Sequence, residues 1–306
     1  MKQSIAQSIA SLALKNRAIE ELLCYLCSQE YLRKNLKLGG LAFGYVYALN
    51  NLEIRVAQLP GYKMYVNIAE PLGIVAYFFR ESGTYWFISQ LISQGDMCID
   101  AGANMGHYTF LMAAIVGKQG KVVAFEPQPN YLQMISDSIS LNSWQDFVSV
   151  ESKALWNKSG EKLNFYLSEN LHNSGTSSLI NHGLYLNAEN RITVETMTLE
   201  DYFQEQGISK CRLLKIDVER AEVQVLRGML NLLKEQAIDY ILLEMYAHSE
   251  SQKILTDLDY TCFFVNQNQE KFLPISTIEP EYFGDYLFVS PKSLNNFTKK
   301  FAEIIV

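Results

Sequence analysis

The chain has 306 residues, of which 48% are apolar and 19% are charged, so it is long enough and apolar enough to bury an ordinary core. Its formal net charge of −7 opposes binding to a phosphate backbone, and we therefore expect no nucleic-acid partner. No apolar run reaches the ~18 residues of a membrane span, and the first residues do not resemble a signal peptide. The five scattered cysteines indicate buried reduced thiols, and we expect a cytoplasmic protein.

Residues 1–80 are predicted to form a helical segment followed by a β-hairpin. Apolar side chains recur at helical spacing from residue 3 to about residue 36. Two alternating runs, 52–59 and 62–68, flank Pro60-Gly61, which predicts a hairpin turn. We expect this segment to pack on the sheet of the following domain as a cap that helps to close the substrate pocket, or to join a second copy of the chain in a homo-oligomer.

Residues 81–306 are predicted to form one α/β domain. Short apolar strands alternate with amphipathic helices, a pattern typical of a doubly wound, mostly parallel sheet with helices on both faces. A polar stretch near 160–197 interrupts the alternation and predicts a hairpin-like insertion. The strands are expected at 97–100, 121–126, 147–151, 213–217, 240–245, 261–265 and 286–289.

One stretch joins a predicted strand to a helix through a glycine turn: Cys98-Ile-Asp-Ala-Gly-Ala-Asn-Met-Gly-His-Tyr-Thr109. In a doubly wound sheet, ligands bind beyond the carboxyl ends of the strands. Gly102 lets the backbone turn tightly, and Gly106 lets the helix N-terminus approach a carboxylate with its free N–H groups. Asp100, before the turn, suits the ammonium group of an amino acid. The turn therefore favours a ligand with an amino-acid end.

A dinucleotide-binding turn is the alternative interpretation. It requires the spacing G-x-G-x-x-G, so that the middle glycine can approach a pyrophosphate. Counted from Gly102, the second and third glycine positions hold Asn104 and His107, whose side chains would crowd a pyrophosphate. Glu126 ends the next strand, where a carboxylate can accept both hydroxyls of a ribose, and this feature fits NAD equally well. An NAD-binding oxidoreductase is thus the less favoured function.

Four motifs in order resemble the FkbM-type methyltransferases. They are Asp-Ala-Gly-Ala-Asn-Met-Gly, Ala-Phe-Glu-Pro-Gln-Pro, Val-Glu-Thr-Met-Thr-Leu-Glu-Asp and Leu-Leu-Lys-Ile-Asp-Val-Glu-Arg-Ala-Glu-Val-Gln-Val-Leu-Arg-Gly, between residues 84 and 245. The resemblance implies a class I methyltransferase, with a Rossmann-like doubly wound sheet of seven strands, the last antiparallel. It also implies S-adenosylmethionine (SAM) as the methyl donor. The acceptor would be a hydroxyl of a sugar, polyketide, peptide or related secondary metabolite, either free or carrier-bound.

The resemblance also implies roles for individual residues. The side of the site that binds the methionine end of SAM would be formed by the residues of the glycine turn, Asp100, Gly102, Asn104 and Gly106. Glu126 would hold the ribose. Ser152 to Ala154 would border the adenine. Asp217, at the tip of the fourth strand, would stand near the methyl group that is transferred.

Methylation of an alcohol requires a group that takes up the hydroxyl proton. Candidates at or after the strand tips are Asp217, Glu219, Glu244 and His248. His248 is the favoured base because a histidine titrates near neutrality. Alternatively, Asp217, Glu219 and Glu244 could bind Mg²⁺ or Ca²⁺, which would acidify a coordinated hydroxyl.

One position departs from the family pattern. The family usually reads Asp-Val-Glu-Gly-Ala-Glu, and Arg220 replaces the glycine here. Arginine does not readily adopt positive φ. Two outcomes stay open: Arg220 reaches into the acceptor pocket and binds an anionic substrate or carrier phosphate, or it pairs on the surface with Glu219 or Glu222. The departure also leaves open a catalytically impaired protein that binds the donor or serves as a scaffold.

Overall fold

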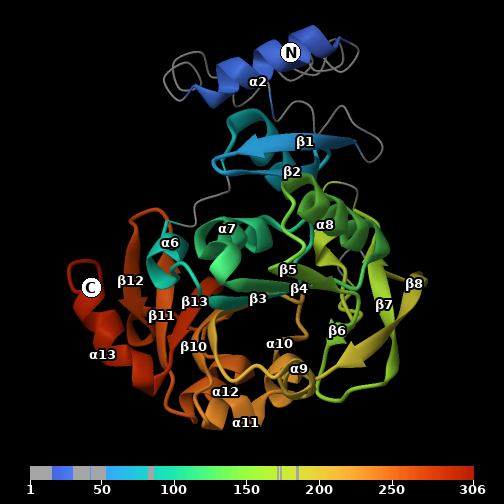
Figure 1. Cartoon of the computed structure of the whole chain (residues 1–306). Helices are drawn as coiled ribbons and strands as arrows, with labels where there is room; N and C mark the ends of the chain where they lie inside the picture. Colours follow the sequence, from blue (N-terminus) through green and yellow to red (C-terminus); the bar gives the residue numbers. More distant parts are fainter. Residues whose placement is uncertain are drawn as a thin grey trace.

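The protein is built on a sheet of eight strands in the order β12-β11-β13-β10-β9-β3-β4-β5 (Figure 1). The computed structural model describes residues 16–29, 42, 53–81, 86–170, 172, 174–183 and 186–306. The strands of this sheet are β3 (Met97–Ala101), β4 (Lys121–Phe125), β5 (Val148–Glu151), β9 (Cys211–Ile216), β10 (Ile238–Tyr246), β11 (Thr261–Asn266), β12 (Lys271–Pro274) and β13 (Phe283–Val289).

The direction of the strands confirms the class I arrangement. β5, β4, β3, β9 and β10 pair in parallel, whereas β13 lies antiparallel between β10 and β11. The sequence predicted seven strands; the eighth, β12, was missed, and it forms the edge of the sheet, where it pairs with β11.

Helices cover both faces of the sheet, as its alternating side chains require. In β3, Cys98 packs in the core under one layer of helices, and Ile99 and Ala101 pack in the core under the other. The first layer contains α6 (Ile88–Leu91), α7 (His107–Val116), α8 (Pro129–Asn142) and α13 (Pro291–Lys300). The second contains α9 (Leu199–Gln206), α10 (Glu222–Arg227), α11 (Leu230–Lys234) and α12 (Glu250–Thr256) (Figure 1).

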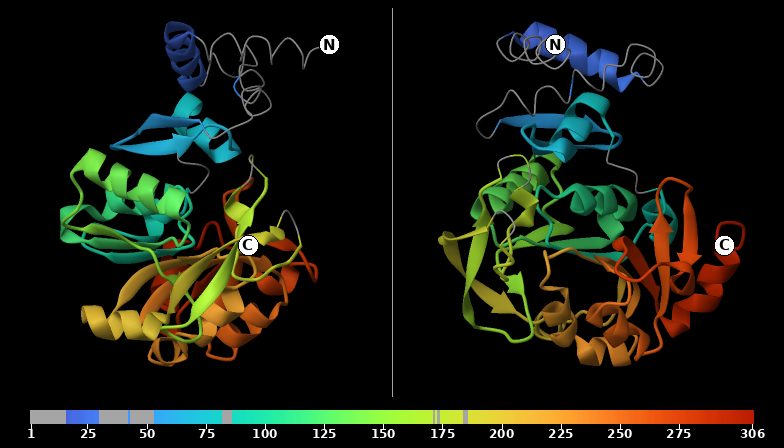
Figure 2. Two further views of the ribbon diagram at one scale, coloured as in Figure 1. Left: turned by 90° about the vertical axis from the view of Figure 1, so that its right-hand side faces the viewer. Right: turned by 180° about the vertical axis from the view of Figure 1, so that it is seen from behind.

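A small separate sheet follows β5 and curls around the edge of the domain (Figures 1 and 2). It has the order β6-β8-β7, formed by β6 (Ala154–Leu155), β7 (Lys162–Ser168) and β8 (Leu186–Met197). β7 and β8 form an antiparallel pair, and the chain between them contains a single 3-10 turn, Ser174–Thr176, among the described residues. This connection reaches the carboxyl ends of the main strands and supplies residues to the site described below.

The N-terminal part lies on the first helical layer. It contains α2 (Arg17–Ser28), β1 (Ile54–Leu59), β2 (Tyr62–Asn67) and α5 (Pro71–Ile74). Leu59 pairs with Tyr62 across the predicted hairpin turn. The hairpin is held to α8 by the backbone N–H of Tyr65, which donates to Ser138 Oγ at 2.9 Å.

The hairpin therefore packs on helices and not directly on the sheet, because α7 and α8 already cover that face (Figure 2). A buried carboxylate holds α2 to the hairpin: Glu20 accepts from Arg55 Nε at 2.8 Å and from the Tyr77 hydroxyl at 2.7 Å. The rest of the helical stretch predicted for residues 3–36 lies outside the described residues. In the described part of the chain, no helix combines the length and the apolar character that a membrane span requires.

Candidate functional site

The glycine turn between β3 and α7 has the geometry that its sequence predicts. Gly102 has a φ of 77°, and a Cβ atom there would lie 1.8 Å from the backbone oxygen of Asp217, so only glycine fits. Asn104 is also left-handed, with a φ of 52°, which asparagine tolerates better than most residues. Gly106 has a φ of 91°, and its missing side chain makes room for the ring of Phe110. Gly106 is therefore required by the packing of α7.

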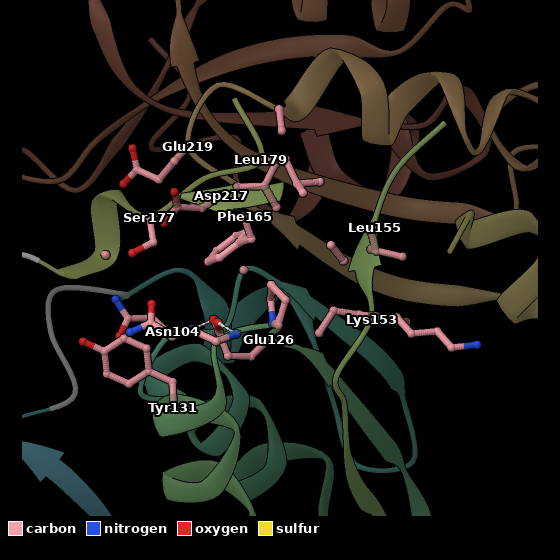
Figure 3. A pocket seen from close by; sticks show the side chains of 18 of the residues that line it. Asn104, Glu126, Tyr131, Lys153, Leu155, Phe165, Ser177, Leu179, Asp217 and Glu219 are labelled. Atoms are coloured by element: carbon pink, nitrogen blue, oxygen red, sulfur yellow. Dashed lines mark hydrogen bonds between the residues drawn. The ribbon is translucent and has the colours of Figure 1, made fainter. Parts of the chain in front are cut away.

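A cavity of about 290 Å³ opens beside this turn, over the carboxyl ends of β3, β4 and β9 (Figure 3). Of the residues predicted to bind the donor, Gly102, Asn104, Glu126, Ala154 and Asp217 line it. The other lining residues are Leu72, Phe125, Pro127, Gln128, Tyr131, Lys153, Leu155, Phe165, Gly175, Ser177, Leu179, Val218, Glu219, Ala221 and Glu244.

Glu126 is fixed by the two loops that border the cavity. Its Oε2 accepts from the backbone N–H of Asn104 and its Oε1 from that of Gln128, both at 2.8 Å. Burial raises the pKa of the Glu126 carboxyl to about 7, although these two N–H groups act to lower it. Each carboxyl oxygen keeps lone pairs for further donors, as the pair of hydroxyls on a ribose would require.

Three residues predicted to touch the donor do not line the cavity: Asp100, Gly106 and Ser152. Asp100 is fully buried, where its Oδ2 accepts from the hydroxyl of Thr109 at 2.6 Å. Side chains alternate along a strand, so Asp100 points beneath the turn toward α7 and not into the cavity. In this arrangement Asp100 does not face the cavity, and its contact with an ammonium group stays a prediction.

A buried lysine connects Asp100 to the cavity. Lys215, on β9, donates from Nζ to the carbonyl of Gly102 at 2.9 Å and lies 3.2 Å from Asp217 Oδ2 and 3.6 Å from Asp100 Oδ1. Its ammonium also lies 5.2 Å from the centre of the Tyr108 ring. Lys215 was not among the residues that the sequence predicted for the site. A lysine within the apolar run Leu-Leu-Lys-Ile is nevertheless a recognisable signal, because a buried cation needs partners.

Carboxyl groups gather at the tips of the neighbouring strands. Glu244 on β10 stands opposite Asp285 on β13, and Asp217 follows β9. Burial raises the pKa of Glu244 to about 8, with further contributions from the charges of Asp217, Asp285 and Glu219. Burial and the nearby acids also raise the pKa of Glu219, to about 7. Part of this cluster is therefore protonated at neutral pH.

Two more cavities meet the first one at these carboxyl groups. A wide groove of about 900 Å³ runs past Arg220 and His248, and a recess of about 180 Å³ lies over Lys215. Asp217 and Glu244 line all three spaces. A molecule bound in the groove or the recess would therefore lie next to a molecule bound in the first cavity, at Asp217 and Glu244.

His248 lies farther from this meeting point than the sequence suggested. It is exposed, it lines only the wide groove, and its Nε2 is 3.3 Å from the carbonyl oxygen of Ile278. For the metal alternative, the described residues include no group of three or more His, Cys, Asp or Glu side chains placed to hold an ion.

Arg220 occupies a left-handed turn without glycine. Its φ is 73°, that of Glu219 is 53°, and its backbone N–H donates to Glu222 Oε1 at 3.0 Å. The contact to Glu222 thus comes from the backbone of Arg220. No ion pair of its guanidinium with Glu219 or Glu222 occurs among the described residues, and the side chain lines the wide groove.

The residues that cover the first cavity opposite the glycine turn were not predicted from the sequence. Phe165, Ser177 and Leu179 come from the insertion and face Glu126 and Asn104 across the space (Figure 3). Tyr131 of α8 and Leu72 of α5 also line it. These residues come from elements far apart in the chain, so no local pattern could assign them to one site.

A sheet of this order, with β13 antiparallel and a ligand cavity over the glycine turn, defines a class I methyltransferase. The model of the methyltransferase FkbM domain matches residues 100–282, and the chain belongs to this family. Membership of this family favours a methyltransferase over the NAD-binding oxidoreductase that was the alternative interpretation of the glycine turn.

Known relatives cover part of the chain. The chain is 29% identical to the methyltransferase sdnD of Sordaria araneosa over 154 residues. This alignment covers 43% of this chain and 59% of that protein. Over 194 residues the chain is 24% identical to the hexuronic acid methyltransferase AglP of Haloferax volcanii, 63% of this chain and 74% of that protein. A solved SAM-dependent O-methyltransferase from Thermotoga maritima is 12% identical, with a TM-score of 0.37 over 80% of each chain.

Proposed function

We propose that the protein is a SAM-dependent O-methyltransferase that acts on a hydroxyl group of a small or carrier-bound molecule, such as a sugar, polyketide, peptide or related secondary metabolite. One observation carries the proposal. The cavity beside the glycine turn meets the groove and the recess at Asp217 and Glu244, so a donor on one side and an acceptor on the other would be adjacent there.

The residues of the first cavity fit SAM. Glu126 offers carboxyl oxygens at the tip of β4, where a ribose would bind. Asn104 Oδ1 is buried and accepts no hydrogen bond from the described residues, an arrangement that suits an ammonium donor. Ala154 and Leu155 offer an apolar wall for an adenine. When bound, SAM supplies a methyl group already activated on a positively charged sulfur.

The chain itself must align the acceptor and remove its proton. We assign the base to Glu244 in place of His248, because Glu244 borders both the donor cavity and the acceptor spaces. In its ionised form the Glu244 carboxylate takes the hydroxyl proton while the oxygen gains the methyl group. Asp217 shares this position and is the second candidate. Proximity and alignment account for most of the remaining acceleration.

The charge of the groove favours acceptors that are not anionic. Its lining contains six acidic residues and a single arginine, Arg220; the acids are Asp217, Glu219, Glu222, Glu244, Glu250 and Glu281. Like charges across a binding surface disfavour association. We therefore expect neutral or cationic hydroxylated acceptors to be better substrates than uronic acids or phosphates. We also propose a cytoplasmic location, which the burial of all five cysteines as reduced thiols supports.

Two measurements test the function. Calorimetry should show SAM binding that NAD does not compete with, and mass spectrometry should show a product heavier by one CH₂ when hydroxylated metabolites, free and carrier-bound, are incubated with SAM. Tighter binding of NAD than of SAM would refute the assignment of the donor. SAM binding without any methylated product across the screen would favour the scaffold interpretation over the enzyme.

A further inference from the structure

The segment from Asn67, at the end of the hairpin, to Leu72, in α5, contacts the donor cavity and two of the elements that border it. It lies outside the residues matched by the family model, which begins at residue 100. The backbone N–H of Asn67 donates to Met105 Sδ in the glycine turn at 3.2 Å. The carbonyl oxygen of Ala69 is 3.0 Å from Nδ1 of His172 in the insertion. Leu72 lines the cavity itself.

A buried carboxyl group lies at the centre of this segment. Glu70 is only 4% exposed, and its Oε1 accepts from the Tyr131 hydroxyl at 2.6 Å and from Asn67 Nδ2 at 2.9 Å. Tyr131 belongs to α8 and lines the donor cavity. The N-terminal part of the chain is thus bonded directly to a wall of the donor site.

The hydrogen bond to Glu70 determines whether the Tyr131 hydroxyl can donate to a ligand or only accept from it. Burial raises the pKa of the Tyr131 phenol above its usual range, with a further contribution from Glu70, so the phenol keeps its proton. That proton is donated to Glu70, so the phenol oxygen can only accept from any other partner. A hydroxyl that donates a hydrogen bond to a carboxylate becomes a stronger hydrogen-bond acceptor itself, because hydrogen bonds in a chain polarise one another.

We propose that Glu70 is a positioning residue of the donor site, which holds Tyr131 so that its phenol oxygen and Asn104 Oδ1 accept from the ammonium group of SAM. Tyr131 and Asn104 lie at the same end of the cavity (Figure 3). Asn104 Oδ1 accepts no hydrogen bond from the described residues, and Asp100 is sealed beneath the turn. The inference rests on the proposed function, since it requires SAM as the ligand.

The test compares two ligands on the full chain by calorimetry: SAM, and 5′-methylthioadenosine, which has the adenosine part but no ammonium group. Glu70→Gln and Tyr131→Phe should each weaken SAM binding by roughly 5- to 20-fold, as expected for one lost hydrogen bond with charge assistance. Neither should change the affinity for 5′-methylthioadenosine more than twofold. The double variant should bind SAM no more weakly than the weaker single variant, because both changes break the same arrangement.

The cap contains a matched control. The Tyr77 hydroxyl donates to Glu20, which is also 4% exposed, at 2.7 Å, so Tyr77→Phe removes the same kind of bond far from the donor cavity. It should lower the melting temperature and leave SAM affinity unchanged. If Glu70→Gln and Tyr131→Phe bind SAM as the unmodified protein does, or lose affinity for both ligands equally, Glu70 has no role toward the ammonium group. Failure of the unmodified protein to bind SAM would instead overturn the proposed function, and this inference with it.

Discussion

Replacing Glu244 by glutamine tests the proposed base most directly. Glutamine has nearly the same shape but cannot take up a proton. The pKa of Glu244 is raised from 4.5 to about 8 by burial and then by the charges of Asp217, Asp285 and Glu219. At pH 7 the carboxyl is then ionised in about one molecule in ten, so turnover of the unmodified protein should rise roughly tenfold as the pH rises from 7 to above 8.

The Glu244→Gln variant should lose this rise and turn over ~10²–10⁴-fold more slowly, the usual contribution of general base catalysis. The assay is kcat against pH from 6 to 10 with saturating donor and the acceptor found by the screen. Glu250→Gln is the matched control: it removes another carboxylate of the same groove, which is exposed and pairs with Arg227. A tenfold rise that persists in Glu244→Gln and disappears in His248→Ala would refute the reasoning and restore the histidine as base.

A melting experiment checks the same pKa without any acceptor. A carboxyl whose folded-state pKa is raised stabilises the fold below its unfolded pKa of 4.5, and this contribution is lost as the pH rises through about 8. Glu244→Gln should therefore have a higher melting temperature than the unmodified protein at pH 9, by about 2–4 °C for each kcal/mol gained in the free energy of unfolding. At pH 4 the two melting temperatures should be nearly equal. Equal melting temperatures at both pH values would show that the pKa is not raised.

Three further outcomes follow from the site. Glu126→Ala should weaken SAM binding at least tenfold in calorimetry, since a charge-assisted hydrogen bond contributes ~1.5–3 kcal/mol, and unchanged affinity would contradict the ribose role. Chelators should leave turnover unchanged, because the described residues form no metal site; loss of activity that Mg²⁺ restores would contradict this. Lys215→Met should move the kcat–pH profile to higher pH, because the Lys215 charge lowers the pKa of Glu244. The control is Arg212→Met, on the same strand β9 as Lys215. It breaks an ion pair with Asp239 of β10 and should not move the profile.

The parts of the site that the sequence predicted are those set by local geometry. Gly102 and Glu126 each come directly after a strand, β3 and β4 respectively. A short motif of strand and turn is therefore enough to place them in the cavity. Asp100 belongs to the same motif, but strand alternation turns its side chain toward α7 and Thr109, away from the cavity. The Glu70–Tyr131 bond joins residues 61 positions apart and has no local signal at all.

The charges around Glu244 suggest an order of events. Burial raises the pKa of Glu244 most, the charges of Asp217, Asp285 and Glu219 raise it further, and the charge of Lys215 lowers it. A positively charged sulfur bound beside Asp217 would favour the ionised form of Glu244, so donor binding should release protons and prepare the base. Calorimetry of SAM binding at pH 7 in buffers of different ionisation enthalpy measures this release. S-adenosylhomocysteine, whose sulfur is neutral, should release fewer protons. Equal release with both ligands, or none with SAM, would mean that Glu244 does not sense the charge that it is proposed to work beside.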